Sequence, residues 1–285
     1  MQCIIAGTGY TGARLLTVID GSVSISRQPL STIDATSCYV RDLDKTSVEP
    51  VVLDNRYAMI CCIPPAVEEA NETRLQRLLH AVHPPLQRIV YLSTTGVYGD
   101  QQGKLTDEST LPAADNARAI RRLTDEKTLL DYGKEHDCEI VILRVPGIYG
   151  PGRLGVDRIQ SGTSFINEAD AYPGNRIHVD DLVRCCIAAV QTNVPAGTYN
   201  VGDGDHRSST AFATLVTDLA GLKAPQTVSR KEANETFSEL RLSFLRESRV
   251  LDTTKMREVL GVVPLYGDPR DGIKSSLIEE GILSG

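Results

Sequence analysis

Compact runs of apolar residues alternate along the chain with longer stretches in which apolar residues recur every three or four positions. Six such runs predict strands covered on both faces: 2–6, 22–26, 36–41, 57–63, 88–93 and 139–144. Three intervening stretches predict amphipathic helices: 10–20, 67–82 and 117–134. This alternation is typical of βαβ units wound by right-handed crossovers onto one sheet. We therefore predict an α/β fold with a doubly wound, Rossmann-type parallel sheet.

The sequence changes in character after residue 150, where Gly, Pro and Asn become frequent and the recognisable strands shorten. Helices at 180–191 and 208–221 and a strand at 198–201 are still predicted. The sequence contains no internal repeat or long linker. We predict a dinucleotide-binding core over residues 1–150, to which some later segments return, and a smaller, mainly substrate-binding lobe over residues 151–285.

Composition and charge exclude several classes of protein. The 285 residues include 30 Lys and Arg against 37 Asp and Glu, and the net charge of −7 argues against a nucleic-acid partner. No apolar run approaches the roughly 20 residues of a membrane helix, and no signal peptide precedes the first predicted strand. The seven cysteines include no Cys-x-x-Cys pair, so we predict reduced thiols and no metal site. We expect a cytoplasmic protein whose partner is a small molecule.

The first predicted strand ends in a glycine-rich turn that is followed at once by a helix. The Gly-x-Gly-x-x-Gly pattern is formed by Gly7, Gly9 and Gly12. Two further candidates for contact with the cofactor, Tyr10 and Thr11, lie within it. In this context the glycines let backbone N–H groups approach a pyrophosphate at the positive end of the helix. The alternative is an ordinary glycine-rich turn without a ligand.

The end of the second predicted strand bears on the choice of dinucleotide. Proteins that bind NAD place an acidic residue there to hold the ribose 2′-hydroxyl. In this chain the strand runs into Ser26-Arg27, and the nearest acidic residues are Asp20 and Asp34. The Arg27 guanidinium suits a 2′-phosphate, although a surface arginine without a ligand is the alternative. The pattern favours NADP as the cofactor and leaves NAD possible.

Several segments, in the same order along the chain, resemble the extended short-chain dehydrogenase/reductase superfamily, also called the NAD-dependent epimerase/dehydratase family. The segments are 42–44, 93–100, 143–153, 175–182 and 198–203. The resemblance implies that Asp42 and Leu43 contact the adenine, and that Pro146 and Ile148 lie under the nicotinamide. It also implies that Thr94 hydrogen-bonds a substrate carbonyl.

Two departures from the family pattern indicate an atypical branch. Ala6 stands where extended members have the first glycine, and the cofactor candidates Ile63, Pro64 and Pro65 stand where typical members carry Ala-Gly. The family's general base is a Tyr with a Lys four residues later and a Glu four residues after that. Counting back from Glu126 in this chain places arginines at both positions, and no Tyr-x-x-x-Lys occurs in the segment.

The arginines at these positions are Arg118 at the Tyr position and Arg122 at the Lys position. A guanidinium stays protonated and cannot accept a proton. We expect Arg118 to bind an anionic group or stabilise an oxyanion, and Arg122 to hydrogen-bond the nicotinamide ribose. An ordinary basic helix face is the alternative. A phenol such as Tyr98, or water, would supply the proton, although Tyr98 also fits a packing role.

Two hypotheses about function follow. The preferred one is an NADP-dependent oxidoreductase or epimerase that acts, mainly in the reducing direction, on a small anionic carbonyl or sugar-like compound. The other is a catalytically silent NADP-binding regulator or sensor. The retained Thr94 segment and the substrate-lobe motifs favour the enzyme, whereas the missing Tyr-x-x-x-Lys favours the regulator. The sequence specifies neither the substrate nor the oligomeric state, and a homodimer is compatible with it.

Overall fold

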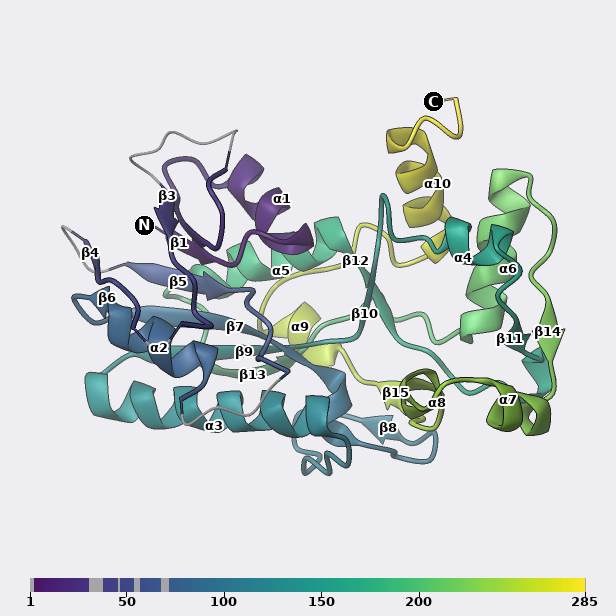
Figure 1. Ribbon diagram of the computed structural model, residues 1–285, viewed down its shortest axis with the longest axis horizontal. Helices are drawn as coiled ribbons and strands as arrows, with labels where there is room; N and C mark the ends of the chain where they lie inside the picture. Colours follow the sequence, from purple (N-terminus) through teal and green to yellow (C-terminus); the bar gives the residue numbers. More distant parts are fainter. Residues whose placement is uncertain (1–2, 31–37, 46, 54–56, 68–71, 285) are drawn as a thin grey trace.

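A seven-stranded parallel sheet forms the core of the computed structural model, which describes residues 3–30, 38–45, 47–53, 57–67 and 72–284 (Figure 1). The strands are β1 (Cys3–Ala6), β2 (Val23–Ser26), β3 (Cys38–Val40), β5 (Ala58–Cys61), β7 (Arg88–Thr94), β9 (Glu139–Val145) and β13 (Gly197–Asn200). Their spatial order is β13-β9-β7-β5-β1-β2-β3, and every pairing is parallel. The predicted doubly wound sheet is confirmed; residues 36 and 37 of the third predicted strand lie outside the described residues.

Helices cover both faces of this sheet (Figure 1). Helices α1 (Tyr10–Val18) and α5 (Val179–Val190) pack on one face, and α2 (Arg74–Ala81) and α3 (Ala117–His136) pack on the other. Successive strand residues point to opposite faces, so Ile5 contributes to the apolar cluster under α1 and α5 while Ile4 contributes to the one under α2 and α3. The sheet is therefore buried on both sides, as its uninterrupted apolar strands require.

Helix α2 begins later than the sequence pattern predicts. Its first residue is Arg74, because Thr73 and Gln76 form a capping box in which each side chain accepts a hydrogen bond from the other residue's backbone N–H. Part of the predicted helix 67–82, residues 68–71, lies outside the described residues.

The smaller lobe has its own apolar cluster, which includes Leu154, Phe212, Leu215 and Ile273. Its helices are α4 (Val156–Gln160), α6 (Ser209–Ala220), α7 (Arg230–Thr236), α8 (Glu239–Leu245) and α10 (Pro269–Glu279), and α9 (Thr254–Glu258) packs beside β13. Short parallel pairs join β10 (Gly147–Tyr149) to β12 (Arg176–His178), β11 (Phe165–Ile166) to β14 (Thr227–Val228), β15 (Val250–Leu251) to β8 (Leu105–Thr106), and β4 (Val51–Val52) to β6 (Val82–His83). No helix within the described residues is long and apolar enough to cross a membrane.

Candidate functional site

The glycine turn after β1 is shaped by two close contacts and one open position. Gly7 has a φ of +89°, and an added Cβ would lie 2.8 Å from Ile63 Cγ1. A Cβ on Gly12 would lie 1.9 Å from the Gly7 carbonyl oxygen, so both positions require glycine. A Cβ on Gly9 would meet nothing within 4 Å. Gly9 therefore faces open space at the start of α1, where a helix N-terminus can receive a phosphate group.

The turn opens into a cavity of about 520 Å³ outside the carboxyl ends of β1, β2 and β5. The strand order reverses between β1 and β5, and open α/β sheets bind ligands at this switch point. The cavity brings together six of the predicted cofactor residues: Gly7, Gly9, Arg27, Leu43, Ile63 and Pro64. Its size and the open Gly9 position fit a dinucleotide, and we call it the turn cavity.

Other predicted cofactor residues lie beside the turn cavity rather than on its lining. Tyr10 donates a hydrogen bond to the Pro151 carbonyl at 2.9 Å, and Thr11 is buried in α1. The Asp42 carboxylate accepts the Asp44 N–H at 3.1 Å, which stabilises its own loop. Pro65 lines a neighbouring cavity on the α2 side.

Arg27 presents a cation to the turn cavity. Its side chain is 71% exposed, and its guanidinium lies 3.8 Å from Asp44 Oδ2. Arg74 donates hydrogen bonds to both oxygens of the Asp44 carboxylate, at 2.6 and 2.7 Å, and these bonds lower the pKa of Asp44. Because Arg74 balances the charge of Asp44, the Arg27 charge remains available to an anion.

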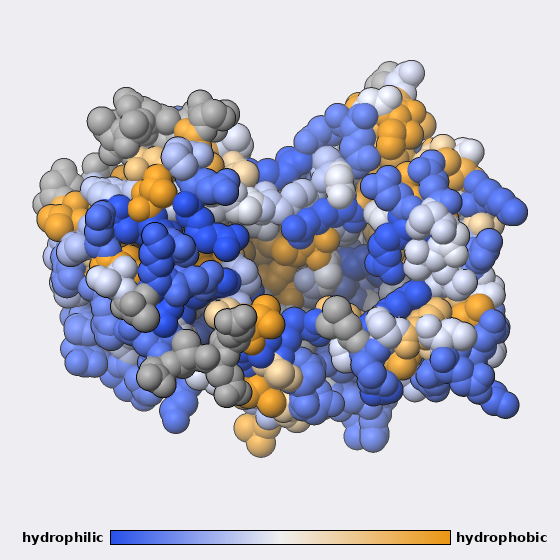
Figure 2. All heavy atoms as spheres, in the orientation of Figure 1, coloured by the Kyte–Doolittle hydropathy of each residue, from blue (hydrophilic) through white to orange (hydrophobic). Residues whose placement is uncertain are grey.

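A second cavity, of about 540 Å³, lies between the carboxyl ends of β7 and β9 and the smaller lobe. Figure 2 shows the molecule hollowed between its two halves. Thr94, Arg118 and Pro146 line this cavity, which we call the lobe cavity. Thr94 Oγ1 accepts the Gly96 N–H at 3.2 Å, so its own O–H is oriented away from that amide and can donate to a ligand. The Arg118 guanidinium stacks on the Phe244 ring at 3.7 Å, and burial lowers the pKa of Arg118.

Arg122 lines neither cavity but contacts Ile63, which lines the turn cavity. Its guanidinium donates to the Tyr91 hydroxyl at 2.8 Å and to the Ile63 carbonyl at 3.3 Å, at the end of β5. Tyr91 in turn donates to Asp125 Oδ2 at 2.7 Å. These contacts fix Arg122 beside the turn cavity, so its surroundings suit a cofactor contact better than a substrate contact.

Two of the predicted site residues, Tyr98 and Ile148, pack in the interior of the protein. Tyr98 has no exposed surface and donates to Asn200 Oδ1 at 2.8 Å, with the Arg144 guanidinium 4.6 Å from its ring. It does not line the lobe cavity, which corrects the expectation that Tyr98 supplies a proton there. Tyr149 is buried against Phe212, and Ile148 packs against the apolar core.

The lobe cavity contains a concentration of positive charge that the sequence did not suggest. Its lining includes six arginines: Arg118, Arg158, Arg176, Arg230, Arg241 and Arg249. One carboxylate, Glu247, lines it as well and already pairs with Arg249 at 2.7 Å. Several guanidiniums lie over aromatic rings, as Arg230 does over Tyr172 at 3.8 Å. Five of these arginines are scattered between residues 158 and 249 at no recognisable spacing, so no sequence motif could reveal them.

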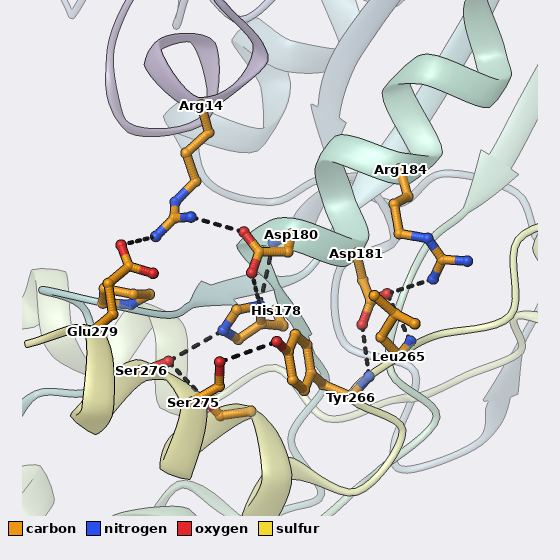
Figure 3. Close-up of polar contacts among 12 residues, drawn as sticks. Arg14, His178, Asp180, Asp181, Arg184, Leu265, Tyr266, Ser275, Ser276 and Glu279 are labelled. Carbon is orange, nitrogen blue, oxygen red and sulfur yellow. Dashed lines mark hydrogen bonds and ion pairs between the residues drawn. The ribbon is translucent and has the colours of Figure 1, made fainter. Parts of the chain in front are cut away.

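A polar cluster ties the smaller lobe to the helix that follows the glycine turn (Figure 3). Arg14 of α1 donates to Asp180 of α5 at 2.9 Å and to Glu279 of α10 at 2.6 Å. Asp181 accepts the backbone N–H groups of Leu265 and Tyr266. The position of α1 is thus fixed by side chains from both parts of the molecule.

The same cluster contains the residue types of a Ser-His-Asp triad, but their geometry is structural. His178 Nδ1 accepts the Asp180 N–H at 3.2 Å, so the ring donates through Nε2 to Ser276 Oγ at 3.1 Å. Ser276 donates its own proton to the Gly272 carbonyl at 2.6 Å. His178 and Ser276 are 1% and 0% exposed, and burial lowers the pKa of His178. The histidine is neutral and has no access to a substrate.

Comparison with known proteins agrees with this geometry. Residues 64–202 match the model of the NAD dependent epimerase/dehydratase family. The "Uncharacterized UDP-glucose epimerase YtcB" of Bacillus subtilis is 27% identical over 74% of this chain and 65% of its own length. The match thus spans less than two thirds of that relative.

Two solved structures share the fold over nearly their whole lengths. One is a functionally unknown conserved protein from Silicibacter pomeroyi, with a TM-score of 0.79, 24% identity and coverage of 98% of this chain and 99% of that chain. The other is MoeE5 in complex with UDP-glucose and NAD, with a TM-score of 0.76, 20% identity and coverage of 99% and 100%.

Residues 64–202 of this chain are thus similar to the NAD dependent epimerase/dehydratase family. The Rossmann-type fold predicted from the sequence is therefore confirmed, and the resemblance to this family agrees with the family match.

Proposed function

We propose that this protein is an NADP-dependent reductase of a small anionic carbonyl compound, such as an acidic or phosphorylated sugar derivative. The observation that carries the proposal is the arginine-rich lobe cavity with Thr94 on its wall, next to a turn cavity that fits a dinucleotide. UDP-glucose in MoeE5 is one example of an anionic sugar compound held by this fold.

The residues of the turn cavity would hold the cofactor. Gly9 leaves room for the pyrophosphate, and Arg27 offers two N–H groups and a charge to a 2′-phosphate. Arg122, held by the Tyr91 hydroxyl of β7 and by the Ile63 carbonyl after β5, would contact the nicotinamide ribose. When bound, the dinucleotide supplies hydride transfer chemistry.

In the lobe cavity, this chain's own groups would orient and polarise the carbonyl. The Thr94 hydroxyl would donate to the carbonyl oxygen, and Arg118 would stabilise the negative charge that develops on it. Arg118 and Arg122 are permanent cations, which disfavour a neighbouring cationic ring and so favour the reducing direction. Water that enters the cavity would supply the proton, because Tyr98 faces the core. Lacking a positioned general acid typically slows turnover by about 10²–10⁴-fold.

A second candidate function is NADP binding without turnover. It is favoured by Arg118 itself, because this position lies on the wall of the lobe cavity and carries a group that cannot transfer a proton. In that case the lobe cavity would bind an anionic effector rather than a substrate.

Turnover assays separate the two candidates. NADPH oxidation by the wild type should be faster with carbonyl compounds that carry a carboxylate or phosphate than with neutral ones. Thr94→Val and Arg118→Met should each lower kcat/KM at least tenfold, whereas the matched control Arg121→Met, on the same helix but outside the lobe cavity, should not. A preference for neutral carbonyls, or full activity in both variants, would contradict the proposal. Tight NADPH binding without oxidation of any compound would favour the binding protein.

A further inference from the structure

Helix α3 begins with a cation whose orientation its own helix does not explain. Arg118 is the second residue of α3, where the partial positive charge of a helix N-terminus disfavours a guanidinium. The guanidinium forms no hydrogen bond or ion pair with any residue that the structure describes. Its carbon lies instead 3.7 Å from the centre of the Phe244 ring, which belongs to α8. The orientation of Arg118 is therefore set by the smaller lobe rather than by α3.

The Phe244 ring is held at this position from both sides of the lobe cavity. On the lobe side, Leu242 of the same helix is buried. On the core side, the residues directly after α8 contact the start of α3, where Asn116 donates to Glu247 Oε1 at 2.8 Å. The other oxygen of Glu247 pairs with Arg249 at 2.7 Å. Helix α8 is thus anchored to both parts of the molecule, with Phe244 against the first turn of α3.

Stacking on a ring orients a guanidinium without using its hydrogen bonds. The aromatic face attracts the cation, while the N–H groups lie in the plane of the guanidinium and stay free for a planar anion such as a carboxylate. Phe244 and Arg118 both line the lobe cavity, and Phe244 is 59% exposed. The stacked pair therefore faces the space that a ligand would occupy.

A role limited to joining the lobe to the core would not require this pair, because the bond between Asn116 and Glu247 already joins them at the same place. We propose that Phe244 is a positioning residue, which holds Arg118 at the wall of the lobe cavity with its N–H groups free to bind an anion. The consequence for catalysis rests on the proposed function, in which Arg118 stabilises charge on the carbonyl oxygen. Because Phe244 comes from the lobe and Arg118 from the core, this arrangement forms only when the two parts are packed together.

The position of Arg118 can be measured without turnover, by NMR of the full chain with isotope-labelled arginine. Protons above an aromatic ring are shielded, so the Nε–H signal of Arg118, identified by its loss in Arg118→Met, should move downfield in Phe244→Ala. Phe244→Tyr keeps a ring and should keep the signal in place. Phe237→Ala is the matched control, because Phe237 stacks on Arg241 at 3.5 Å and does not line the cavity. It should move the Arg241 signal and leave that of Arg118 unchanged.

Kinetics test whether this position matters for the proposed reaction. Phe244→Ala should lower kcat for NADPH oxidation at least fivefold with a smaller rise in KM, because a misplaced Arg118 stabilises the developing charge less well. Phe244→Tyr should retain a kcat close to that of the wild type. Phe244→Ala added to Arg118→Met should cause no further loss, because the ring acts only through the guanidinium.

Different outcomes would overturn the two proposals. An Arg118 signal that stays in place in Phe244→Ala, or an equal loss of kcat with and without Arg118, would overturn the positioning role. A wild type that oxidises no NADPH with any carbonyl compound would overturn the proposed function, while a shift of the Arg118 signal would still support the role of Phe244 in orienting it. Phe244→Leu keeps most of the side-chain volume without the ring, so it should repeat the alanine result if Phe244→Ala folds poorly.

Discussion

At the scale of single residues, Asp203 is a carboxyl group buried in an environment that disfavours its charge. Its side chain is 2% exposed, and Oδ1 accepts the Asp205 N–H at 3.0 Å, while Oδ2 has no hydrogen-bond partner within the described residues. The pKa of Asp203 is raised to about 7, mainly by burial and also by the charge of Asp205, while the charge of Arg176 lowers it. A buried carboxyl group of this kind is more stable protonated.

The consequence for stability follows from the sign of this shift. The folded-state pKa lies above the unfolded value of 3.8, so the contribution of Asp203 is present at low pH and is lost as pH rises towards 7. Asp203→Asn should therefore raise the free energy of unfolding at pH 8 by on the order of 3 kcal/mol, with a smaller gain at pH 5. Urea unfolding at both pH values measures it, with the exposed Asp218→Asn as control. A variant less stable than wild type at pH 8 would contradict the argument.

Arg27 is the residue on which the choice of cofactor depends. If its exposed guanidinium binds the 2′-phosphate, NADP should bind at least tenfold more tightly than NAD, a difference of about 1.4 kcal/mol. Arg27→Ala should remove most of this difference and leave NAD affinity nearly unchanged, as calorimetry can measure. Arg270→Ala, an exposed arginine on α10, should leave both affinities unchanged. Equal affinities in the wild type would rule out the assignment.

At the scale of elements, Gly9 and Gly12 have different roles in the turn between β1 and α1. Gly9 has extended backbone angles, φ −73° and ψ −158°, which any residue adopts. Gly12 instead packs against the Gly7 carbonyl. Access of a ligand to the turn therefore depends on Gly9, whereas the folding of the turn depends on Gly12.

Two substitutions test this separation. Gly9→Val should leave thermal unfolding nearly unchanged while weakening NADPH binding at least hundredfold, because the side chain occupies the open space that the pyrophosphate needs. Gly12→Ala should lower the unfolding temperature, because its Cβ overlaps the Gly7 oxygen. Wild-type NADPH affinity in Gly9→Val would show that the turn cavity is not the cofactor site.

At the scale of the whole molecule, the features that could be predicted from the sequence are those that depend on residues close together in the chain. Strand and helix order follows from hydrophobic periodicity, and the turn cavity follows from glycines only a few residues apart. The lobe cavity combines arginines from α3, α4, α7 and α8, and two residues that contact each other at its edge, Asn116 and Glu247, lie 131 positions apart. Tertiary structure alone brings such residues together, just as the Asn200 contact, 102 positions away, turns Tyr98 towards the core.

The contact between Arg14 and Glu279 joins residues 265 positions apart, which has a consequence for biosynthesis. Helix α1 emerges from the ribosome well before its partner in α10, which is made only after both the core and most of the lobe. During synthesis the nascent core can form its sheet while Arg14 still lacks this partner. Ligand binding by a ribosome-bound chain should therefore develop in two stages, with the glycine turn present early and the final orientation of α1 reached only once α10 has been released.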